Sequence, residues 1–173
     1  MSEVTFVLGG CRSGKSSHAL SLAEARAGRN NVFVATCVAH DAEMADRVRR
    51  HQEERGEQWQ TVEAPLDLAR AVSDHGASAD VMVVDCLTLW MSNLIMDERN
   101  DDAVSDAVAG LTDALSAARC PVFLVSNEVG TGIVPENQLA RRFRDLTGFA
   151  NQRMAACADR VIWMVAGIPV AIK

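Results

Sequence analysis

The hydrophobic positions of this chain fall into short runs separated by longer segments of mixed polarity. The runs are almost continuously apolar rather than alternating, which is typical of parallel strands covered on both faces. The segments between them are long enough to hold the helices that connect such strands. The runs are residues 4–8, 32–35, 81–84, 122–125 and 161–165, and residues 60–62 could add an edge strand. The pattern therefore predicts an α/β fold.

Between these runs, apolar residues recur at helical spacing. The clearest helix is predicted over residues 102–118, where apolar residues recur at i, i+4, i+7 and i+11 from Val104. Another is predicted from about residue 138 towards residue 158, and Gly148 inside it could interrupt the helix. Two further helices are predicted over residues 16–26 and 41–55.

Composition limits the classes of function. Of the 173 residues, Lys and Arg make up 17 and Asp and Glu 23, and this net charge of −6 argues against the broad basic surface of nucleic-acid-binding proteins. The longest uncharged stretches, residues 86–96 and 161–172, are shorter than the roughly 18 apolar residues of a membrane-spanning helix. No basic segment precedes the first apolar run, so no secretory signal is expected and the predicted location is cytoplasmic. No repeat or linker divides the chain, so residues 1–173 are expected to form one domain.

A glycine-rich segment between the first predicted strand and the first predicted helix fits the phosphate-binding pattern G-x-x-x-x-G-K-[ST] in full. Glycines let successive backbone N–H groups turn inward around phosphates at the start of a helix. Lys15 would then reach the β- and γ-phosphates, and the Ser16 hydroxyl would bind Mg²⁺. The predicted nucleotide-binding residues of this P-loop are Gly9, Gly10, Cys11, Arg12, Ser13, Gly14, Lys15 and Ser16.

An acid ends another of the apolar runs. Asp85 follows four apolar residues at the carboxyl end of a predicted strand. Alone, an aspartate at a strand end is often the cap of the next helix. Beside a P-loop, we expect Asp85 to help Ser16 to hold or orient the metal.

His51 allows two interpretations. On the helix predicted over residues 41–55, it follows Met44 and Val48 on the apolar stripe. A lone histidine there is usually packed in a core. The alternative is a nucleophile, because neutral imidazole is available at pH 7 and can attack phosphorus.

Several longer motifs make the whole chain resemble one enzyme family. They are the P-loop sequence GGCRSGKS, EMADRVRRH over residues 43–51, VDCLT over residues 84–88, SNEVGTGIVPEN over residues 126–137, LARRFRD over residues 139–145 and NQR over residues 151–153. In these motifs the chain is similar to the bifunctional adenosylcobinamide kinase/adenosylcobinamide-phosphate guanylyltransferase family of cobalamin biosynthesis. The segment over residues 126–137 is the most specific of them.

The resemblance implies a RecA-like P-loop NTPase fold, a mostly parallel sheet flanked by helices in three α/β/α layers. It also implies two reactions. A nucleoside triphosphate, ATP or GTP with Mg²⁺, phosphorylates the aminopropanol hydroxyl of adenosylcobinamide, and GTP then transfers GMP to adenosylcobinamide phosphate through a guanylylated histidine. The matching histidine is His51, and Lys15 is the second expected catalytic residue. A homotrimer with active sites near the subunit interfaces is also implied.

The same resemblance extends the nucleotide site beyond the P-loop. The added positions are Ala35, Thr36, Cys37, Gln52, Glu53, Glu54, Arg55, Glu63 and Asp85. Read alone, Glu63 and residues 52–55 would be solvated surface positions. The irregular segment over residues 127–137 follows a predicted strand, where open α/β sheets place ligand loops, so we expect it to contact the corrinoid.

Two other functions share the P-loop and Asp85. One is a simple P-loop kinase of a small molecule, and the other is a RecA-type NTPase module whose hydrolysis drives a macromolecular partner. Neither would form a covalent GMP adduct, so labelling of the protein by GTP distinguishes them from the two-step transferase.

Overall fold

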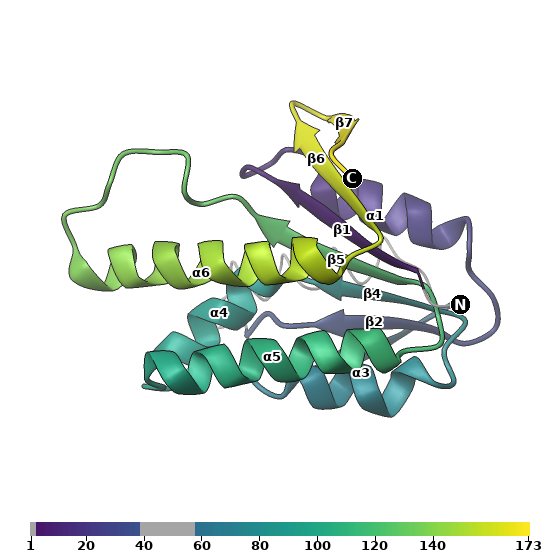
Figure 1. The fold of residues 1–173 in the computed structure, drawn as a ribbon. Helices are drawn as coiled ribbons and strands as arrows, with labels where there is room; N and C mark the ends of the chain where they lie inside the picture. Colours follow the sequence, from purple (N-terminus) through teal and green to yellow (C-terminus); the bar gives the residue numbers. More distant parts are fainter. Residues whose placement is uncertain (1–2, 39–57) are drawn as a thin grey trace.

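A mostly parallel sheet forms the centre of the computed structural model, which describes residues 3–38 and 58–173 (Figure 1). Within these residues the sheet has seven strands in the order β3-β2-β4-β5-β1-β6-β7. Every neighbouring pair is parallel except β6 and β7. The strands are β1 (Val4–Gly9), β2 (Asn31–Ala35), β3 (Trp59–Glu63), β4 (Val81–Asp85), β5 (Val122–Asn127), β6 (Arg160–Val165) and β7 (Ile168–Ala171).

The strands predicted from the apolar runs are confirmed, including the edge strand β3. β7 was not predicted, because residues 161–172 form one uncharged stretch that hides a reversal of the chain. Ala166 and Gly167 turn the chain there with positive φ angles of 51° and 84°. Positive φ at both central residues suits the tight turns that join antiparallel strands.

Helices cover both faces of this sheet within the described residues. They are α1 (Lys15–Glu24), α3 (Leu68–Gly76), α4 (Leu87–Met96), α5 (Asp101–Ala117) and α6 (Gln138–Cys157). The predictions for α1, α5 and α6 are confirmed, and Gly148 does not interrupt α6. The helix predicted over residues 41–55 lies outside the described residues.

Asparagine side chains begin the two longest of these helices. Asn100 precedes α5 and accepts a hydrogen bond from the N–H of Ala103, and Asn137 precedes α6 and accepts one from Ala140. Each satisfies a backbone donor that lacks a partner within its helix. These caps fix where the two helices begin.

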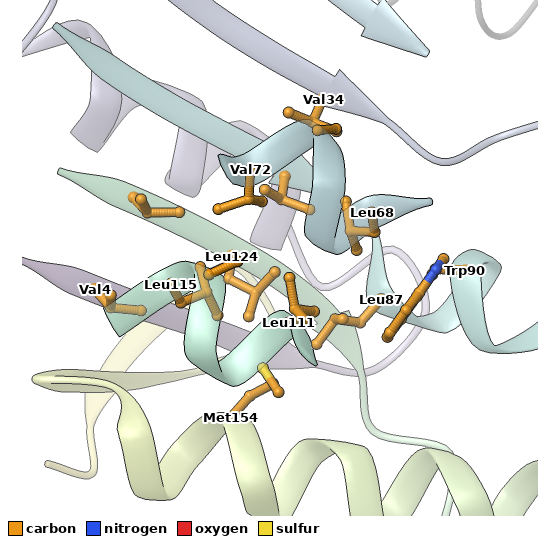
Figure 2. Close-up of a cluster of buried hydrophobic side chains, with 14 of the residues drawn as sticks. Val4, Val34, Leu68, Val72, Leu87, Trp90, Leu111, Leu115, Leu124 and Met154 are labelled. Atoms are coloured by element: carbon orange, nitrogen blue, oxygen red, sulfur yellow. The ribbon is translucent and has the colours of Figure 1, made fainter. Parts of the chain in front are cut away.

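Side chains of alternating strand positions divide the interior into two clusters. Val4 and Phe6 of β1 join the larger cluster, which packs the sheet against α3, α4, α5 and α6 (Figure 2). Val7 joins the smaller one, in which Ala19 and Ala23 of α1 approach the opposite face. The near-continuous apolarity of the strands is explained by this burial on both faces. Because apolar side chains fill both faces of the sheet, its polar residues gather at the carboxyl edge.

Candidate functional site

The P-loop joins the end of β1 to the start of α1. Gly14 precedes α1 in a left-handed conformation with a φ of 87°, and Arg12 has a φ of 53°. Gly9 is required for another reason, because a Cβ there would lie 2.6 Å from Ser13 Oγ and 2.8 Å from the carbonyl oxygen of Met164. The turn aims the first amides of α1 at the loop, where helix termini bind phosphate.

The cation of the P-loop is held close to the loop itself. The Lys15 ammonium donates a hydrogen bond of 3.1 Å to the carbonyl oxygen of Gly10. A Cβ at Gly10 would have no heavy atom within 4 Å, so the backbone is open at this position. The loop therefore combines a positive charge with approachable backbone, which is the arrangement that cradles a polyphosphate.

A hollow of about 300 Å³ lies beside the P-loop. The Gly167 N–H of the β6–β7 turn donates to the carbonyl oxygen of Ser13 over 3.1 Å and fastens this turn to the loop. Arg12, Glu128, Thr131 and Trp163 are among the residues that line the hollow, and the Trp163 side chain is 41% exposed. The hollow thus offers two charged groups and an aromatic surface next to the P-loop.

The carboxyl ends of the strands bring the other predicted residues to the same edge. Ala35 of β2 is paired in register with Glu63 of β3 on one side and Asp85 of β4 on the other. Gly9 of β1 is paired with Asn127 of β5. At about 4.8 Å per strand, the strand of Asp85 is about 10 Å from β1 and that of Glu63 about 19 Å. Asp85 is therefore the nearer of the two acids to the P-loop strand, and Glu63 is too far away to contact phosphates held by the P-loop.

Thr36 holds the chain that follows Asp85. Its hydroxyl donates 2.7 Å to the carbonyl oxygen of Cys86 and accepts 2.8 Å from the N–H of Cys86. The Thr36 N–H donates to the carbonyl oxygen of Asp85, and the residue is fully buried. Its side chain therefore fixes the position of Asp85, while the neighbouring Ala35 and Cys37 are half-buried.

Helix α4, which the sequence analysis did not predict, fixes the loops of this edge. Asn93 Nδ2 donates to the carbonyl oxygens of Thr36 at 2.8 Å and Pro65 at 3.0 Å. Trp90 Nε1 donates to the carbonyl oxygen of Leu66 at 2.8 Å. The loops after β2 and β3 are thus tied to one helix. A helix that is apolar all round is typical of a buried one, and the uncharged stretch over residues 86–96 carried that signal.

The thiol next to Asp85 is not a nucleophile. Burial, and then the Asp85 carboxylate, raise the pKa of Cys86 to about 12. The group is therefore protonated at neutral pH, and the thiolate is the reactive form of cysteine. Cys86 serves as a small buried side chain.

The residues present suit Mg²⁺ better than a metal held by the protein alone. Within residues 3–38 and 58–173, no group of three or more His, Cys, Asp or Glu side chains gathers as a metal site. Mg²⁺ on a nucleotide typically takes one or two oxygens from the protein and the rest from phosphates and water. The Ser16 hydroxyl and the Asp85 carboxylate are oxygen donors of this kind.

Five of the predicted site residues cannot be placed. His51, Gln52, Glu53, Glu54 and Arg55 lie outside the described residues, so their contribution to the site stays a prediction.

None of the described helices combines the length and apolarity that crossing a bilayer requires.

Comparison with known families shows to which family the chain belongs. The family model described as cobinamide kinase / cobinamide phosphate guanyltransferase matches residues 5–172. The chain belongs to this family. The resemblance seen in the sequence is thereby confirmed, and with it the two activities, a kinase and a guanylyltransferase, that the family name gives.

Similar curated proteins cover nearly the whole chain. The bifunctional adenosylcobalamin biosynthesis protein CobU of Escherichia coli is 41% identical over 181 residues, covering 96% of this chain and 98% of that protein. CobU of Salmonella typhimurium is 41% identical over 179 residues with the same coverage. CobP of Pseudomonas aeruginosa is 39% identical over 169 residues, covering 96% of this chain and 95% of that protein.

Solved structures with the same fold are more distant in sequence. The RadB recombinase has a TM-score of 0.55 at 16% identity and covers 93% of this chain and 73% of its own. The flagellar accessory protein FlaH from Methanocaldococcus jannaschii has a TM-score of 0.51 at 13% identity. The match covers 99% of this chain and 78% of FlaH. These likenesses confirm the RecA-like P-loop fold of this family member.

Proposed function

We propose that this chain performs both transfers of its family at the carboxyl edge of its sheet, with His51 as the guanylylated intermediate. The first transfer places the γ-phosphoryl group of ATP or GTP on the aminopropanol hydroxyl of adenosylcobinamide. The second places GMP from GTP on adenosylcobinamide phosphate and yields adenosylcobinamide-GDP. The observation that carries the proposal is a complete P-loop at the same edge of the sheet as Asp85, two strands away, in a chain matched by the family from residue 5 to 172.

In the kinase step, the attacking oxygen forms a bond to the γ-phosphorus while the bond to the β–γ bridging oxygen breaks. The nucleoside diphosphate leaves, and the hydroxyl proton passes to solvent or to a nearby base. The P-loop amides and Lys15 hold the β- and γ-phosphates and stabilise the charge that develops on their oxygens. Ser16 and Asp85 are the residues that would hold Mg²⁺, which would neutralise negative charge on the phosphates.

In the guanylyl step, a ring nitrogen of His51 attacks the α-phosphorus of GTP and pyrophosphate leaves. A phosphate oxygen of adenosylcobinamide phosphate then attacks the same phosphorus, the P–N bond breaks and the imidazole is regenerated. Covalent capture divides one difficult transfer into two easier ones. The role of His51 is supported by the family membership and by its match to the family motif.

The remaining predicted residues suit the nucleoside rather than the triphosphate end. We place Ala35, Cys37 and Glu63 near the guanosine during the second transfer, together with residues 52–55. Support comes from the register of Ala35 and Glu63 at the same edge, about 19 Å from the P-loop strand for Glu63. Thr36 contributes by holding Asp85 in place.

The hollow beside the P-loop suits the substrate that accepts the transferred group, adenosylcobinamide or its phosphate. Glu128 and Thr131 belong to the segment over residues 127–137, which was expected to contact the corrinoid, and both line the hollow. Arg12 would pair with the phosphate of adenosylcobinamide phosphate, and the exposed face of Trp163 would pack on the apolar part of the side chain that carries it.

A homotrimer and a cytoplasmic location also remain proposals. Apolar side chains of the β6–β7 hairpin are exposed in the single chain, among them Val165, Ile168 and Val170. Ile133, in the loop between β5 and α6 that projects from the body in Figure 1, is 96% exposed. Surfaces of this kind are commonly covered by a partner copy. Light scattering of the purified protein measures the number of copies.

The decisive experiment follows the α-phosphate of GTP. The protein is incubated with Mg²⁺ and GTP labelled at the α-phosphorus, and intact-mass and peptide spectra locate any GMP adduct. We expect an acid-labile, base-stable adduct on His51, as a phosphorus–nitrogen bond implies. The His51→Ala variant should form no adduct and should retain kinase turnover on adenosylcobinamide.

A second histidine provides the control. His75 lies at the carboxyl end of α3, and His75→Gln should label as the wild type does. An adduct that persists in His51→Ala would refute the assignment of the nucleophile. Kinase turnover without any adduct would identify a simple kinase, and hydrolysis stimulated by a macromolecule without an adduct would identify a RecA-type module.

A further inference from the structure

The first half of α6 extends past the carboxyl edge of the sheet (Figure 1). Asn151 marks the level of the strand ends, because its Nδ2 atom donates over 3.1 Å to the carbonyl oxygen of Asn127, the last residue of β5. Its Oδ1 atom accepts a hydrogen bond of 2.7 Å from Ser126 Oγ. At 1.5 Å per residue, the helical residues before Asn151 reach up to about 20 Å beyond that level. This half of α6 therefore borders the space that a ligand of the carboxyl edge must enter.

The projecting half of α6 is fastened to the loop that precedes it. Arg141 Nη1 donates to the carbonyl oxygens of Pro135 at 3.0 Å and Glu136 at 2.5 Å. The Asn137 side chain ends the loop and caps the helix by accepting from the N–H of Ala140. The loop belongs to the segment over residues 127–137, which was expected to contact the corrinoid. Loop and helix thus form one wall of the proposed acceptor site.

Arg144 lies on the face of this half that is turned towards the sheet. It precedes Asn151 by seven positions, and two positions seven apart differ by only about 20° around a helix. Thr147, between them on this face, is fully buried, and the Arg144 side chain is only 22% exposed. Seven residues correspond to about 10 Å along the helix. Arg144 therefore lies about 10 Å further out than the contact between Asn151 and the end of β5.

The guanidinium of Arg144 is held less firmly than that of its neighbour. Arg142 Nε donates to Asp101 Oδ1 over 2.8 Å, and its Nη2 atom donates to the carbonyl oxygen of Arg99. Among the described residues, Arg144 instead directs its Nε and Nη2 atoms at one oxygen, Oδ1 of the adjacent Asp145, over 3.2 and 3.1 Å. The Asp145 side chain is 57% exposed, and exposed ion pairs contribute little. Arg144 can therefore exchange this carboxylate for the oxygens of a bound anion.

The two proposed acceptors differ in one anionic group. Adenosylcobinamide offers a hydroxyl, whereas adenosylcobinamide phosphate carries a phosphate monoester with a charge of about −1.5 to −2 at pH 7. The phosphates of the nucleotide are expected at the P-loop, whose helix α1 packs on the opposite face of the sheet from α6. A cation on the projecting half of α6 therefore suits the acceptor phosphate better than the nucleotide. Arginine binds phosphate in a bidentate manner that lysine does not reproduce.

We propose that Arg144 is a specificity-determining residue of the guanylyl transfer, whose guanidinium binds the phosphate of adenosylcobinamide phosphate from the α6 side. Arg12 lines the hollow at the P-loop and would contact the same phosphate from the other side. Adenosylcobinamide has no group for Arg144 to bind, so the residue favours the second acceptor over the first. The inference rests on the proposed guanylyl transfer.

The test compares the two acceptors in the same variants. Arg144→Met keeps most of the aliphatic stem and removes the charge. It should raise the KM for adenosylcobinamide phosphate at least about tenfold and leave the KM for adenosylcobinamide in the kinase step within about twofold. Arg144→Lys, which keeps the charge without the planar fork, should recover part of the loss. Labelling by GTP alone should match the wild type in both variants, because this half-reaction contains no acceptor.

Two further variants distinguish substrate binding from a structural role. Asp145→Asn removes the carboxylate that pairs with Arg144, so a role limited to this ion pair predicts the same loss as in Arg144→Met. We expect no loss, because the released guanidinium remains available to the phosphate. Arg153 lies nine positions after Arg144, two and a half turns away and so on the opposite face of α6, where it lines a hollow against α5. Arg153→Met should leave both KM values unchanged.

Equilibrium dialysis gives a second measurement that needs no turnover. The wild type should bind adenosylcobinamide phosphate several-fold more tightly than adenosylcobinamide, and Arg144→Met should remove this difference. The proposal is overturned if the wild type binds the two equally, if Arg144→Met keeps the difference or raises both KM values alike, or if that variant loses GTP labelling. A wild-type protein that forms no GMP adduct would instead contradict the proposed function, and the dialysis would still test Arg144.

Discussion

Two halves of the carboxyl edge are built in different ways. The P-loop half uses the backbone of consecutive residues, with Gly14 and Arg12 in left-handed conformations and the Lys15 ammonium on the carbonyl oxygen of Gly10. The other half consists of the chain segments that follow β2, β3 and β5. Their positions are fixed by side chains from distant helices, such as Asn93 of α4 and Asn151 of α6. Removing the charge of the first half should change chemistry more than stability, whereas substitutions in the second half should change stability as well.

The largest expected effect is on the chemistry of the P-loop half. Lys15→Met keeps most of the aliphatic stem and removes the charge, so kcat/KM of the kinase step should fall about 100- to 1000-fold. The free energy of unfolding should change by less than about 0.5 kcal/mol, because the ammonium makes one hydrogen bond to its own loop. Steady-state kinetics and urea unfolding measure the two effects.

Removing a surface charge elsewhere is the control for this prediction. Arg70 of α3 pairs with Asp74 at 3.4 Å, and its side chain is 80% exposed. Arg70→Ala should leave both kcat/KM and the free energy of unfolding nearly unchanged, because exposed ion pairs contribute little. A loss below tenfold in Lys15→Met would mean that this cation is not at the reacting phosphates.

A large effect on stability is expected in the other half. Asn93→Ala removes two hydrogen bonds and leaves the carbonyl oxygens of Thr36 and Pro65 without their donor. The free energy of unfolding should fall by about 2–3 kcal/mol in urea unfolding. Asn93→Asp should cost at least as much in spite of its equal size, because it turns a carboxylate oxygen towards two carbonyl oxygens.

An asparagine whose side-chain hydrogen bond is exposed to solvent gives the matched control. Asn30 donates one hydrogen bond of 2.9 Å to the carbonyl oxygen of Ser78 at the surface. Asn30→Ala should cost less than about 1 kcal/mol, because water replaces the lost partner. Equal losses in the two alanine variants would show that α4 does not hold the loops as its hydrogen bonds indicate.

A smaller effect distinguishes two neighbouring glycines within the P-loop half. Gly9→Ala brings a Cβ within 2.8 Å of the Met164 carbonyl oxygen, a backbone atom that cannot swing away. The free energy of unfolding should fall by about 1–3 kcal/mol. Gly10→Ala meets open space and should change it by less than about 0.5 kcal/mol. Similar losses at both positions would contradict the close approach of β6 to the loop.

The mildest test compares one cysteine from each half. Cys11 of the P-loop is exposed, whereas Cys86 after Asp85 is buried and its pKa is raised to about 12. At pH 8 the thiolate is the reactive form, so N-ethylmaleimide should modify Cys11 in the folded protein and leave Cys86 intact. Peptide mass spectra measure both, and unfolding in urea should expose Cys86 to the reagent.

The raised pKa of Cys86 also determines how pH changes the stability of the folded protein. The folded protein keeps the Cys86 proton to about pH 12, whereas the unfolded chain loses it near the ordinary value of 9.0. Stability from this group is therefore fully present below pH 9 and is lost as pH rises towards 12. Cys86→Ala should lose less stability than the wild type over this range. A steeper loss in the variant would contradict the assignment.

Local patterns were sufficient where the structure is local or strongly periodic. The apolar runs predicted the central strands, and the stripe from Val104 predicted α5. They failed at α4, whose apolarity has no helical period, and at α3 and β7, which the pattern left unassigned. Asn93 and Asn151 gave no signal either, since an asparagine inside a helix has no meaning until its distant partner is known.

The sequence by itself determined the family, the P-loop and the strands on which the site is built. These depend on residues that are consecutive or regularly spaced, so their physical requirements can be read along the chain. Only the tertiary structure decided that Thr36 holds the chain after Asp85, that α4 ties the loops after β2 and β3, and that Asn151 ties α6 to the end of β5. Such contacts join groups 24 to 57 positions apart, and hydrogen bonds between them exist only after packing has excluded water.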